Sequence, residues 1–328
     1  MRYPQKIQIT RMKENKNIDY ISEISRLKKK GNAIILAHYY QAGEIQDIAD
    51  FVGDSLALSQ KAASNNADII LFAGVKFMAE TAKILSPGKK VLLPDLNAGC
   101  SLADSCKADD FKKFIDDNPG RTVITYVNTN TDIKVLSDII CTSSNAVQII
   151  ESLPVKEKVI FAPDRNLGNY IINKTGRDIA VWNGACHVHE EFSLEAILKL
   201  KKENPDAKII AHPECELPVR MIADFIGSTS ALLQFTRKDD STSYIVATEP
   251  GIIHQMKKSN PFKSYIPAPP NDSTCGCSEC NFMKLITIEK IYTCLRDEKP
   301  EILIDGDVLL KAKKPILRMM EISEKFGL

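Results

Sequence analysis

The chain has 328 residues, of which 44% are hydrophobic and 26% charged, and its formal net charge is +1. This balance gives no global field that would favour nucleic acid, and the apolar runs are too short to span a bilayer. The N-terminal segment lacks the apolar core and cleavage site of a signal peptide. We therefore expect a cytoplasmic protein of two or three domains, with no nucleic-acid or membrane partner.

Three segments of the chain carry the same pattern of residues. Asp138 follows Asp50 by 88 residues, and Asp224 follows Asp138 by 86. The first and third copies are close matches, IADFVGDSLAL and IADFIGSTSAL, and the second is more diverged. A period of this length indicates an internal repeat of one structural unit.

The elements of each copy alternate between strand and helix. An apolar run rich in β-branched residues opens each copy and predicts a strand, at residues 33–37, 122–126 and 207–211. Apolar residues at i, i+3 and i+7 follow and predict a helix packed on one face. A Ser/Thr-rich turn then begins a second helix. Two further apolar runs, with a helical stretch between them, predict a second and a third strand.

This alternation predicts an α/β fold of three homologous three-layer αβα domains with short parallel sheets, arranged with pseudo-threefold symmetry around a central active site. We place the domains at residues 1–105, 106–190 and 191–299. The C-terminal helices, within residues 300–328, are expected to pack on the first domain. Ligands of parallel sheets bind beyond the carboxyl ends of the strands, so three equivalent ends can face one cavity.

Polar residues recur at fixed distances from the three aspartates. Twelve residues before them lie His38, Tyr126 and His212; ten before lie Tyr40, Asn128 and Glu214; five after lie Ser55, Ser143 and Thr229. A lone histidine after a strand is more often structural, but the repeat favours a shared cavity with histidine as acid, base or anion donor. Glu214 is either a base or a carboxylate that caps the next helix. The Ser/Thr turns are helix N-caps that also offer sites for anions.

Cysteines follow the third strand of each copy. Cys100 and Cys186 are 86 residues apart, and the third copy carries a CxCxxC group of Cys275, Cys277 and Cys280. Nine cysteines cannot all pair within one chain, and structural disulfides are rare in a reducing compartment. Each cysteine alone can be a small buried hydrophobic residue. Three thiolates converging on one axis instead indicate a metal or an iron–sulfur cluster.

Other motifs narrow the chemistry. Among the nearby histidines, His187 and His189 follow Cys186 directly, and one of them is expected to touch a ligand. The loop APDRNLG, with Asp164 and Arg165, is interpreted as an ion-paired structural loop. No GxGxxG, Walker A or GxSxG motif is present, which disfavours nicotinamide, nucleotide and serine-hydrolase chemistry.

The chain resembles the A-type, iron–sulfur-dependent quinolinate synthases over nearly its whole length. The motifs that carry the resemblance are ILAHYYQAGEIQDIADFVGDS, YVNTNTDIKVLSDIICTSSNAV, FAPDRNLG, HPECELPVRMIADFIGSTS, TEPGIIH and KKPILRM. The resemblance implies condensation of iminoaspartate with dihydroxyacetone phosphate to quinolinate, a precursor of NAD. It also implies one [4Fe–4S] cluster per chain and a functional link to an enzyme that produces iminoaspartate.

The resemblance carries roles to individual residues. It implies Cys100, Cys186 and Cys280 as cluster ligands, with Cys280 chosen over its neighbours because CNFMK matches the family pattern. It implies Tyr40, Tyr126, His212 and Glu214 as catalytic residues. The implied substrate-binding residues are His38, Ser55, Asn128, Ser143, His189, Ser228 and Thr229. An iron left open by three cysteines would act as a Lewis acid.

Two other functions fit parts of the pattern. A cluster-dependent hydro-lyase acting on a hydroxy acid would share the open iron but would need no phosphate site. A non-catalytic metal or redox sensor would bind its metal through the CxCxxC group alone, so Cys100 and Cys186 discriminate it from the enzyme.

Overall fold

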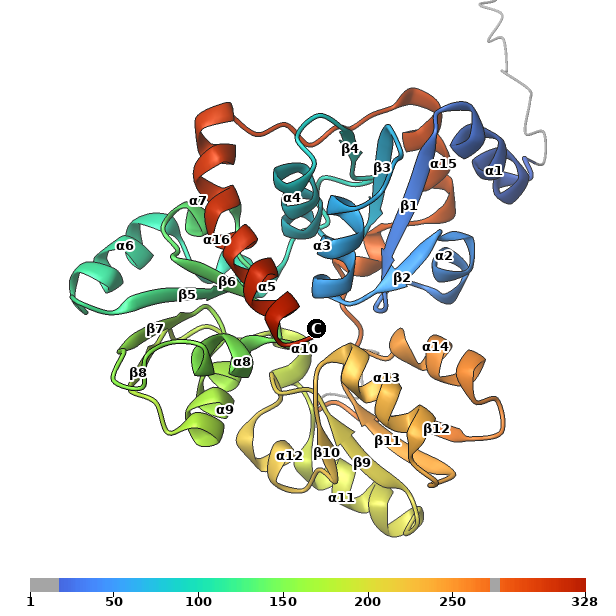
Figure 1. Ribbon diagram of the computed structural model, residues 1–328. Coiled ribbons are helices and arrows are strands. Elements are labelled where there is room, and N and C mark those ends of the chain that lie inside the picture. The colour runs from blue at the N-terminus through green and yellow to red at the C-terminus, as the bar shows by residue number, and fades with distance from the viewer. Residues whose placement is uncertain (1–17, 272–277) are drawn as a thin grey trace, which may run out of the picture.

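The computed structural model describes residues 18–271 and 278–328. Three four-stranded parallel sheets lie around the middle of the molecule, with helices on their faces (Figure 1). Their strand orders are β2-β1-β3-β4, β6-β5-β7-β8 and β10-β9-β11-β12, so the three units share one topology. This confirms three αβα units with short parallel sheets. The sheets fall inside the predicted domain ranges, whose boundaries stay a prediction.

The first unit lies at the upper right of Figure 1. Its elements are α1 (Tyr20–Lys30), β1 (Ala33–His38), α2 (Gly43–Ile48), β2 (Phe51–Gly53), α3 (Ser55–Ala63), β3 (Ile69–Ala73), α4 (Lys76–Leu85), β4 (Lys90–Leu92) and α5 (Ser101–Asp104). The central strand β3 is buried along its whole length. Such continuous apolar runs are typical of parallel strands covered on both faces.

The second unit lies at the left of Figure 1 and repeats this order. Its elements are α6 (Ala108–Asp116), β5 (Thr122–Tyr126), α7 (Thr131–Val135), β6 (Ile139–Cys141), α8 (Ala146–Glu151), β7 (Val159–Ala162), α9 (Arg165–Thr175), β8 (Ile179–Val181) and α10 (His187–Glu190).

The third unit lies at the lower right and is followed by the C-terminal helices. The elements are α11 (Leu194–Glu203), β9 (Lys208–Ala211), α12 (Leu217–Met221), β10 (Phe225–Ile226), α13 (Thr229–Lys238), β11 (Ser243–Ala247), α14 (Ile252–Ser259), β12 (Ser264–Pro267), the 3₁₀ turn η1 (Met283–Leu285), α15 (Ile288–Asp297) and α16 (Gly306–Lys325). Neighbouring residues of β9, Ile209 and Ile210, belong to separate cores on the two faces of the sheet. The alternation of a strand therefore creates the three layers.

The repeated aspartates have one structural role. Asp50, Asp138 and Asp224 each accept a hydrogen bond from a backbone N–H near the start of the first strand of their unit, at 2.7–2.8 Å. The backbone N–H of each aspartate also donates to the carbonyl of the same strand residue. Each aspartate thereby fixes the chain that enters the outer strand against β1, β5 or β9.

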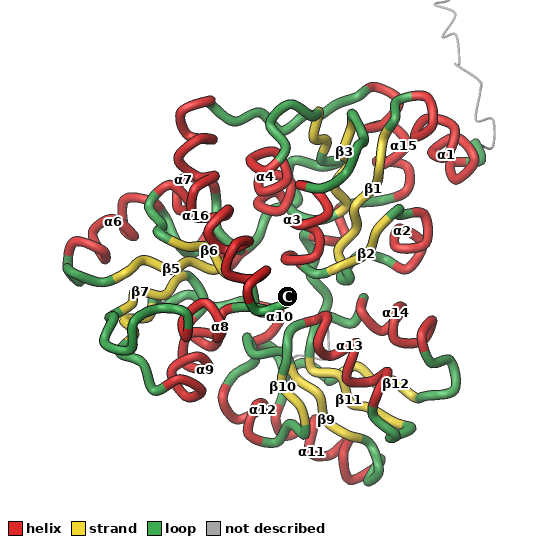
Figure 2. Tube along the Cα trace, in the orientation of Figure 1, coloured by secondary structure: helices red, strands yellow, loops and turns green. Residues whose placement is uncertain are grey.

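The structure corrects the predicted helix around each aspartate. The i, i+3, i+7 pattern placed Val52, Ile140 and Ile226 on a helix, but these residues lie in the short strands β2, β6 and β10. The helices that follow the first strands, α2, α7 and α12, end before the aspartates. The backbone of each aspartate is hydrogen-bonded to the neighbouring strand. Each sheet therefore has four strands, where the sequence predicted three (Figure 2).

The C-terminal segment also differs from its prediction. Helix α16 packs against α4 of the first unit, but it packs more extensively against α7, β6 and α8 of the second. Ile316, Met319 and Ile322 form its buried stripe, and Asn145 of the second unit donates a hydrogen bond to Ser323 at 2.9 Å. The prediction named only the first unit, whereas α16 bridges two. Helix α15, which lies before this segment and inside the predicted third domain range, packs on α1 of the first unit. None of the helices in the described ranges has both the length and the apolar character to cross a membrane.

Candidate active site

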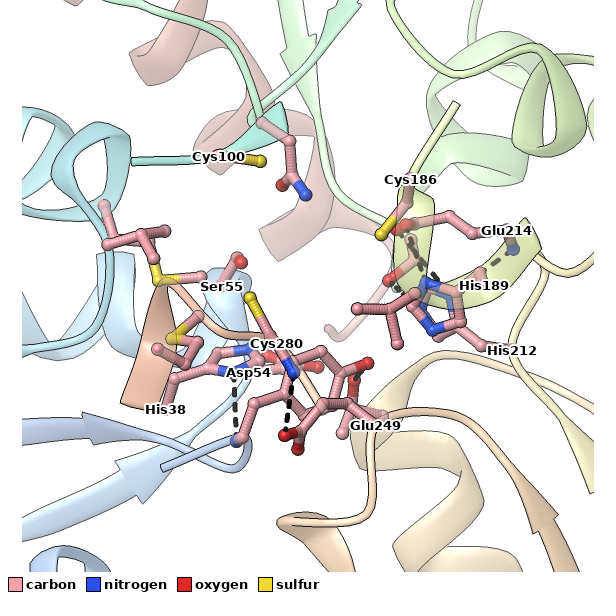
Figure 3. Close-up of a pocket in the computed structure, with 18 of the residues that line it drawn as sticks. His38, Asp54, Ser55, Cys100, Cys186, His189, His212, Glu214, Glu249 and Cys280 are labelled. Atoms are coloured by element: carbon pink, nitrogen blue, oxygen red, sulfur yellow. Dashed lines mark hydrogen bonds and ion pairs between the residues drawn. The ribbon is translucent and has the colours of Figure 1, made fainter. Parts of the chain in front are cut away.

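A cavity lies where the three units meet, and side chains from all three line it (Figure 3). Every predicted site residue except Ser228 is in its wall: His38, Tyr40, Ser55, Cys100, Tyr126, Asn128, Ser143, Cys186, His189, His212, Glu214, Thr229 and Cys280. Ser228 instead caps α13, where its hydroxyl accepts a hydrogen bond from the N–H of Ala231 at 3.3 Å. The polar residues that follow β1, β5 and β9 therefore share one space.

The two repeat-equivalent histidines are held in the same way. The backbone N–H of Tyr40 donates to Nδ1 of His38 at 3.2 Å, and that of Glu214 donates to Nδ1 of His212 at 3.3 Å. Because Nδ1 is an acceptor in both rings, a neutral imidazole carries its proton on Nε2. Burial lowers the pKa of His38 to about 4 and that of His212 to about 3. Both rings are thus neutral donors near neutral pH, suited to an anionic ligand.

These two histidines predict a loss of stability in acid. In the unfolded chain their pKa returns to 6.5, so between pH 6.5 and about 4 the unfolded state binds more protons than the folded state. The free energy of unfolding therefore falls as the pH decreases, by up to about 2.7 kcal/mol per pH unit for two groups. Urea titrations of iron-free protein at about pH 7 and about pH 5 measure this slope. His254→Gln, which changes a partly exposed histidine, should leave it unaltered; equal midpoints at both pH values would refute the prediction.

Glu214 is the buried charge at the centre of the polar network. Burial alone would raise the pKa of Glu214, but its pairing with His189 and the hydrogen bond from Tyr126 hold that pKa below its usual value, so Glu214 is a carboxylate. The Tyr126 hydroxyl donates to Glu214 Oε1 at 2.6 Å, and His189 Nδ1 lies 3.1 Å from Oε2. Burial and the nearby carboxylate raise the pKa of Tyr40 and Tyr126 well above the usual value. Both phenols therefore stay protonated and can donate hydrogen bonds.

Three cysteine side chains enter the cavity from different directions. Cys100 precedes α5, Cys186 precedes α10, and Cys280 precedes η1. Figure 3 shows their sulfur atoms pointing into the same space. Burial raises the pKa of Cys100 to about 12 and that of Cys280 to about 11, and it raises that of Cys186 well above its usual value. Cys275 and Cys277 lie outside the described residues, so the choice of Cys280 stays a prediction.

Two buried carboxyl groups, on Asp164 and Glu249, accept hydrogen bonds from the cysteine loops. Asp164 follows β7 and accepts a hydrogen bond from the N–H of Cys186 at 3.3 Å. Glu249 occupies the equivalent position after β11 and accepts one from the N–H of Cys280, also at 3.3 Å. Glu249 further pairs with Lys284 at 2.8 Å. The loop that the sequence analysis interpreted as ion-paired and structural is ion-paired through Arg165, which pairs with Glu190, whereas Asp164 caps α9.

Comparison with known proteins agrees with this geometry. The family model described as quinolinate synthetase A protein matches residues 22–321. The chain belongs to this family. Curated relatives named quinolinate synthase include those of Thermosynechococcus vestitus (58% identical over 306 residues, 93% of this chain and 96% of the relative), Synechococcus sp. (57% over 305, 93% and 95%) and Microcystis aeruginosa (58% over 305, 93% and 95%). As a member of the quinolinate synthase family, the chain is an enzyme of NAD biosynthesis.

The donor atoms of the cavity fit the iron–sulfur group expected of a quinolinate synthase. Three free thiols from three units share its wall, and their raised pKa values mean that they ionise only when a cation compensates the charge. Metal binding supplies that compensation and releases the thiol protons. A second group can hold a single ion, since the ligand atoms of Cys186, His189 and Glu214 lie within 4.8 Å of one another. An iron–sulfur cluster differs from a single ion in that each cysteine would bind a different iron, so the three sulfur atoms need not converge on one point.

Several residues of the cavity wall were not predicted from the sequence. Asp54 lines the cavity, caps α3 and accepts a hydrogen bond from Ser144 of the second unit at 2.6 Å. Glu249 lies in the motif TEPGIIH, and its position two residues after β11, equivalent to that of Asp164 after β7, was the available signal. The apolar part of the wall had no signal, because its residues come from elements far apart in the sequence: Val75, Phe77, Met78, Val188 and Met283.

Proposed function

We propose that the chain condenses iminoaspartate with dihydroxyacetone phosphate to form quinolinate, with release of phosphate and water. The observation that carries the proposal is the single cavity in which all three units combine thiols, neutral hydrogen-bond donors and a buried carboxylate. Thiols alone would serve a sensor, and a hydro-lyase would need fewer donors for anions. The combination supports a substrate pair with two carboxylates and a phosphate.

Neutral donors are the proposed binding groups for these anions. His38 and Asn128 reach the cavity from the ends of β1 and β5, and Ser55 and Thr229 stand in the first turns of α3 and α13. Free N–H groups at a helix N-terminus attract negative charge. Ser143 completes the set of donors, and Ser228 contributes through the turn that it caps. His189 is proposed to border the substrate through its ring in the cavity wall. Uncharged donors suit this task because they bind an anion without burying a permanent charge.

The proposed acid–base groups are Tyr40, Tyr126, His212 and Glu214. Formation of the ring requires proton removal from carbon and proton delivery to departing oxygen, and each is a task for a positioned side chain. Glu214 stays ionised and accepts a hydrogen bond from the Tyr126 hydroxyl at 2.6 Å, so Tyr126 is polarised toward proton exchange with a ligand. His212 holds its proton on Nε2, which lies 3.2 Å from Ser143 Oγ at the cavity wall.

The proposed cofactor is one [4Fe–4S] cluster per chain, held by Cys100, Cys186 and Cys280. When bound, it supplies one iron without a protein ligand, a Lewis acid for a hydroxyl or carbonyl oxygen. Iminoaspartate is an imine and hydrolyses in water, so we further propose a functional link to the enzyme that produces it.

Product analysis tests this function. Anaerobically purified, iron-replete protein is mixed with dihydroxyacetone phosphate and iminoaspartate generated in place, and quinolinate is quantified by mass spectrometry. We expect quinolinate only when both substrates are present. Iron-replete protein that forms none would refute the proposal, and dehydration of a hydroxy acid in its place would favour the hydro-lyase.

A further inference from the structure

A chain of hydrogen-bonding groups crosses all three units through Thr248, a residue that the proposed function does not use. Thr248 follows β11, is fully buried, and is not part of the cavity wall. Its Oγ1 lies 2.8 Å from the Tyr40 hydroxyl and 3.0 Å from Nε2 of His189. It therefore connects a tyrosine of the first unit to a histidine of the second.

The groups beyond His189 set the direction of the hydrogen bonds. Glu214 accepts a hydrogen bond from the Tyr126 hydroxyl on Oε1 and faces the His189 ring with Oε2, so it acts as an acceptor on both oxygens. His189 Nδ1 lies 3.1 Å from Glu214 Oε2, at ion-pair distance though not aligned for a full hydrogen bond, and within residues 18–271 and 278–328 it has no other acceptor. A proton on Nδ1 is thus stabilised by the carboxylate, and Nε2 is left as an acceptor.

The hydrogen bonds of Thr248 set the donor–acceptor direction at Tyr40. A threonine hydroxyl has one proton, and Thr248 donates it in a hydrogen bond to Nε2 of His189. Its oxygen remains an acceptor, so the Tyr40 hydroxyl donates to Thr248. The lone pairs of the Tyr40 oxygen are then free toward the cavity and toward Thr229, whose Oγ1 lies 3.2 Å away.

We propose that Thr248 is a positioning residue that orients the Tyr40 hydroxyl as a proton acceptor toward the bound substrate and joins it to the His189–Glu214 pair. The inference rests on the proposed function for the roles of Tyr40 and Glu214. One proton leaves the substrate for the Tyr40 oxygen as the Tyr40 proton passes to Thr248, the Thr248 proton to Nε2 of His189, and the Nδ1 proton to Glu214 Oε2. Each group gives one proton and takes one, so only the substrate and Glu214 change charge.

Two substitutions of Thr248 separate its hydroxyl from its packing. Thr248→Val keeps the shape and removes the hydroxyl, whereas Thr248→Ser keeps the hydroxyl. We expect kcat of the Val variant to fall by about 100-fold, the scale of a misplaced reacting group. We expect KM and the iron and sulfide content to stay at wild-type values, and the Ser variant to recover most of the activity. Thr236→Val is the matched control, because Thr236 is equally buried in the same unit but bonds the Leu233 carbonyl away from the cavity.

A spectroscopic measurement keeps the inference testable apart from turnover. Nitrogen NMR of isotope-labelled histidine in the iron-replete protein, assigned with a His189→Gln variant, reports which ring nitrogen of His189 carries the proton. We expect the Nδ1–H form in the wild type and the Ser variant, and a mixture of forms in the Val variant. An Nε2–H form in the wild type would overturn the inference even if the protein forms no quinolinate. Wild-type kcat in Thr248→Val, or equal losses in the Val and Ser variants, would overturn it while the proposed function stands.

Discussion

Anaerobically purified Cys186→Ala protein is expected to lose its bound iron and sulfide, and its quinolinate formation should fall by more than about 100-fold. Loss of a residue that hydrogen-bonds to a metal ligand typically lowers metal affinity or activity by about 10–100-fold, and loss of the ligand itself is expected to lower them further. The structure supports a shared site because Cys100, Cys186 and Cys280 reach the cavity from different elements of the fold. Removing one thiol leaves two of the three ligands proposed for the cluster, too few to hold it.

The control for this substitution is Cys294→Ala. Cys294 is also buried, but it lies in α15 and packs in the apolar core. We expect this variant to keep the iron and sulfide of the wild type, as measured by colorimetric assay of both elements. A Cys186→Ala protein with full iron and sulfide would contradict a site shared by the three units and would favour a sensor that binds metal through the C-terminal cysteines alone.

The second large effect is expected for Glu214→Gln. Glutamine keeps the size of the side chain but has no charge, so it can neither stabilise the Nδ1 proton of His189 nor take up a proton from Tyr126. Loss of an acid–base group costs about 10²–10⁴-fold in kcat. We expect a decrease in that range in a steady-state assay, with iron and sulfide retained.

Glu216→Gln provides the comparison, because Glu216 is two residues away and exposed. It should have wild-type kcat. If Glu214→Gln also turns over at the wild-type rate, Glu214 is a structural carboxylate. That outcome would favour the alternative from the sequence, in which Glu214 caps the helix that follows it.

The repeat explains why so much of the site could be predicted from the sequence. A motif that recurs with its spacing intact must place its residues at the same point of each unit, so His38, Tyr126 and His212 had to lie at equivalent strand ends. The convergence of these ends was an inference from symmetry, and the cavity bears it out. The repeated aspartates, chosen only as markers, turned out to hold the first strand of each unit.

The remaining features depend on contacts that no local pattern records. Thr248 meets Tyr40 across 208 residues of sequence, and Glu249 meets Cys280 from a different segment of the third unit. The short strands β2, β6 and β10 were mistaken for helix because a few apolar residues fit either period. The sequence of α16 does not record which elements the helix packs against, and these elements belong to two units.

The most direct test of a cluster with one open iron beside the substrate is a Mössbauer spectrum of protein reconstituted with isotope-enriched iron, recorded with and without quinolinate. The account predicts about four irons and about four sulfides per chain, with about one quarter of the iron signal shifting when quinolinate binds. A spectrum in which quinolinate shifts none of the iron, or a protein that binds a single ion without sulfide, would contradict it.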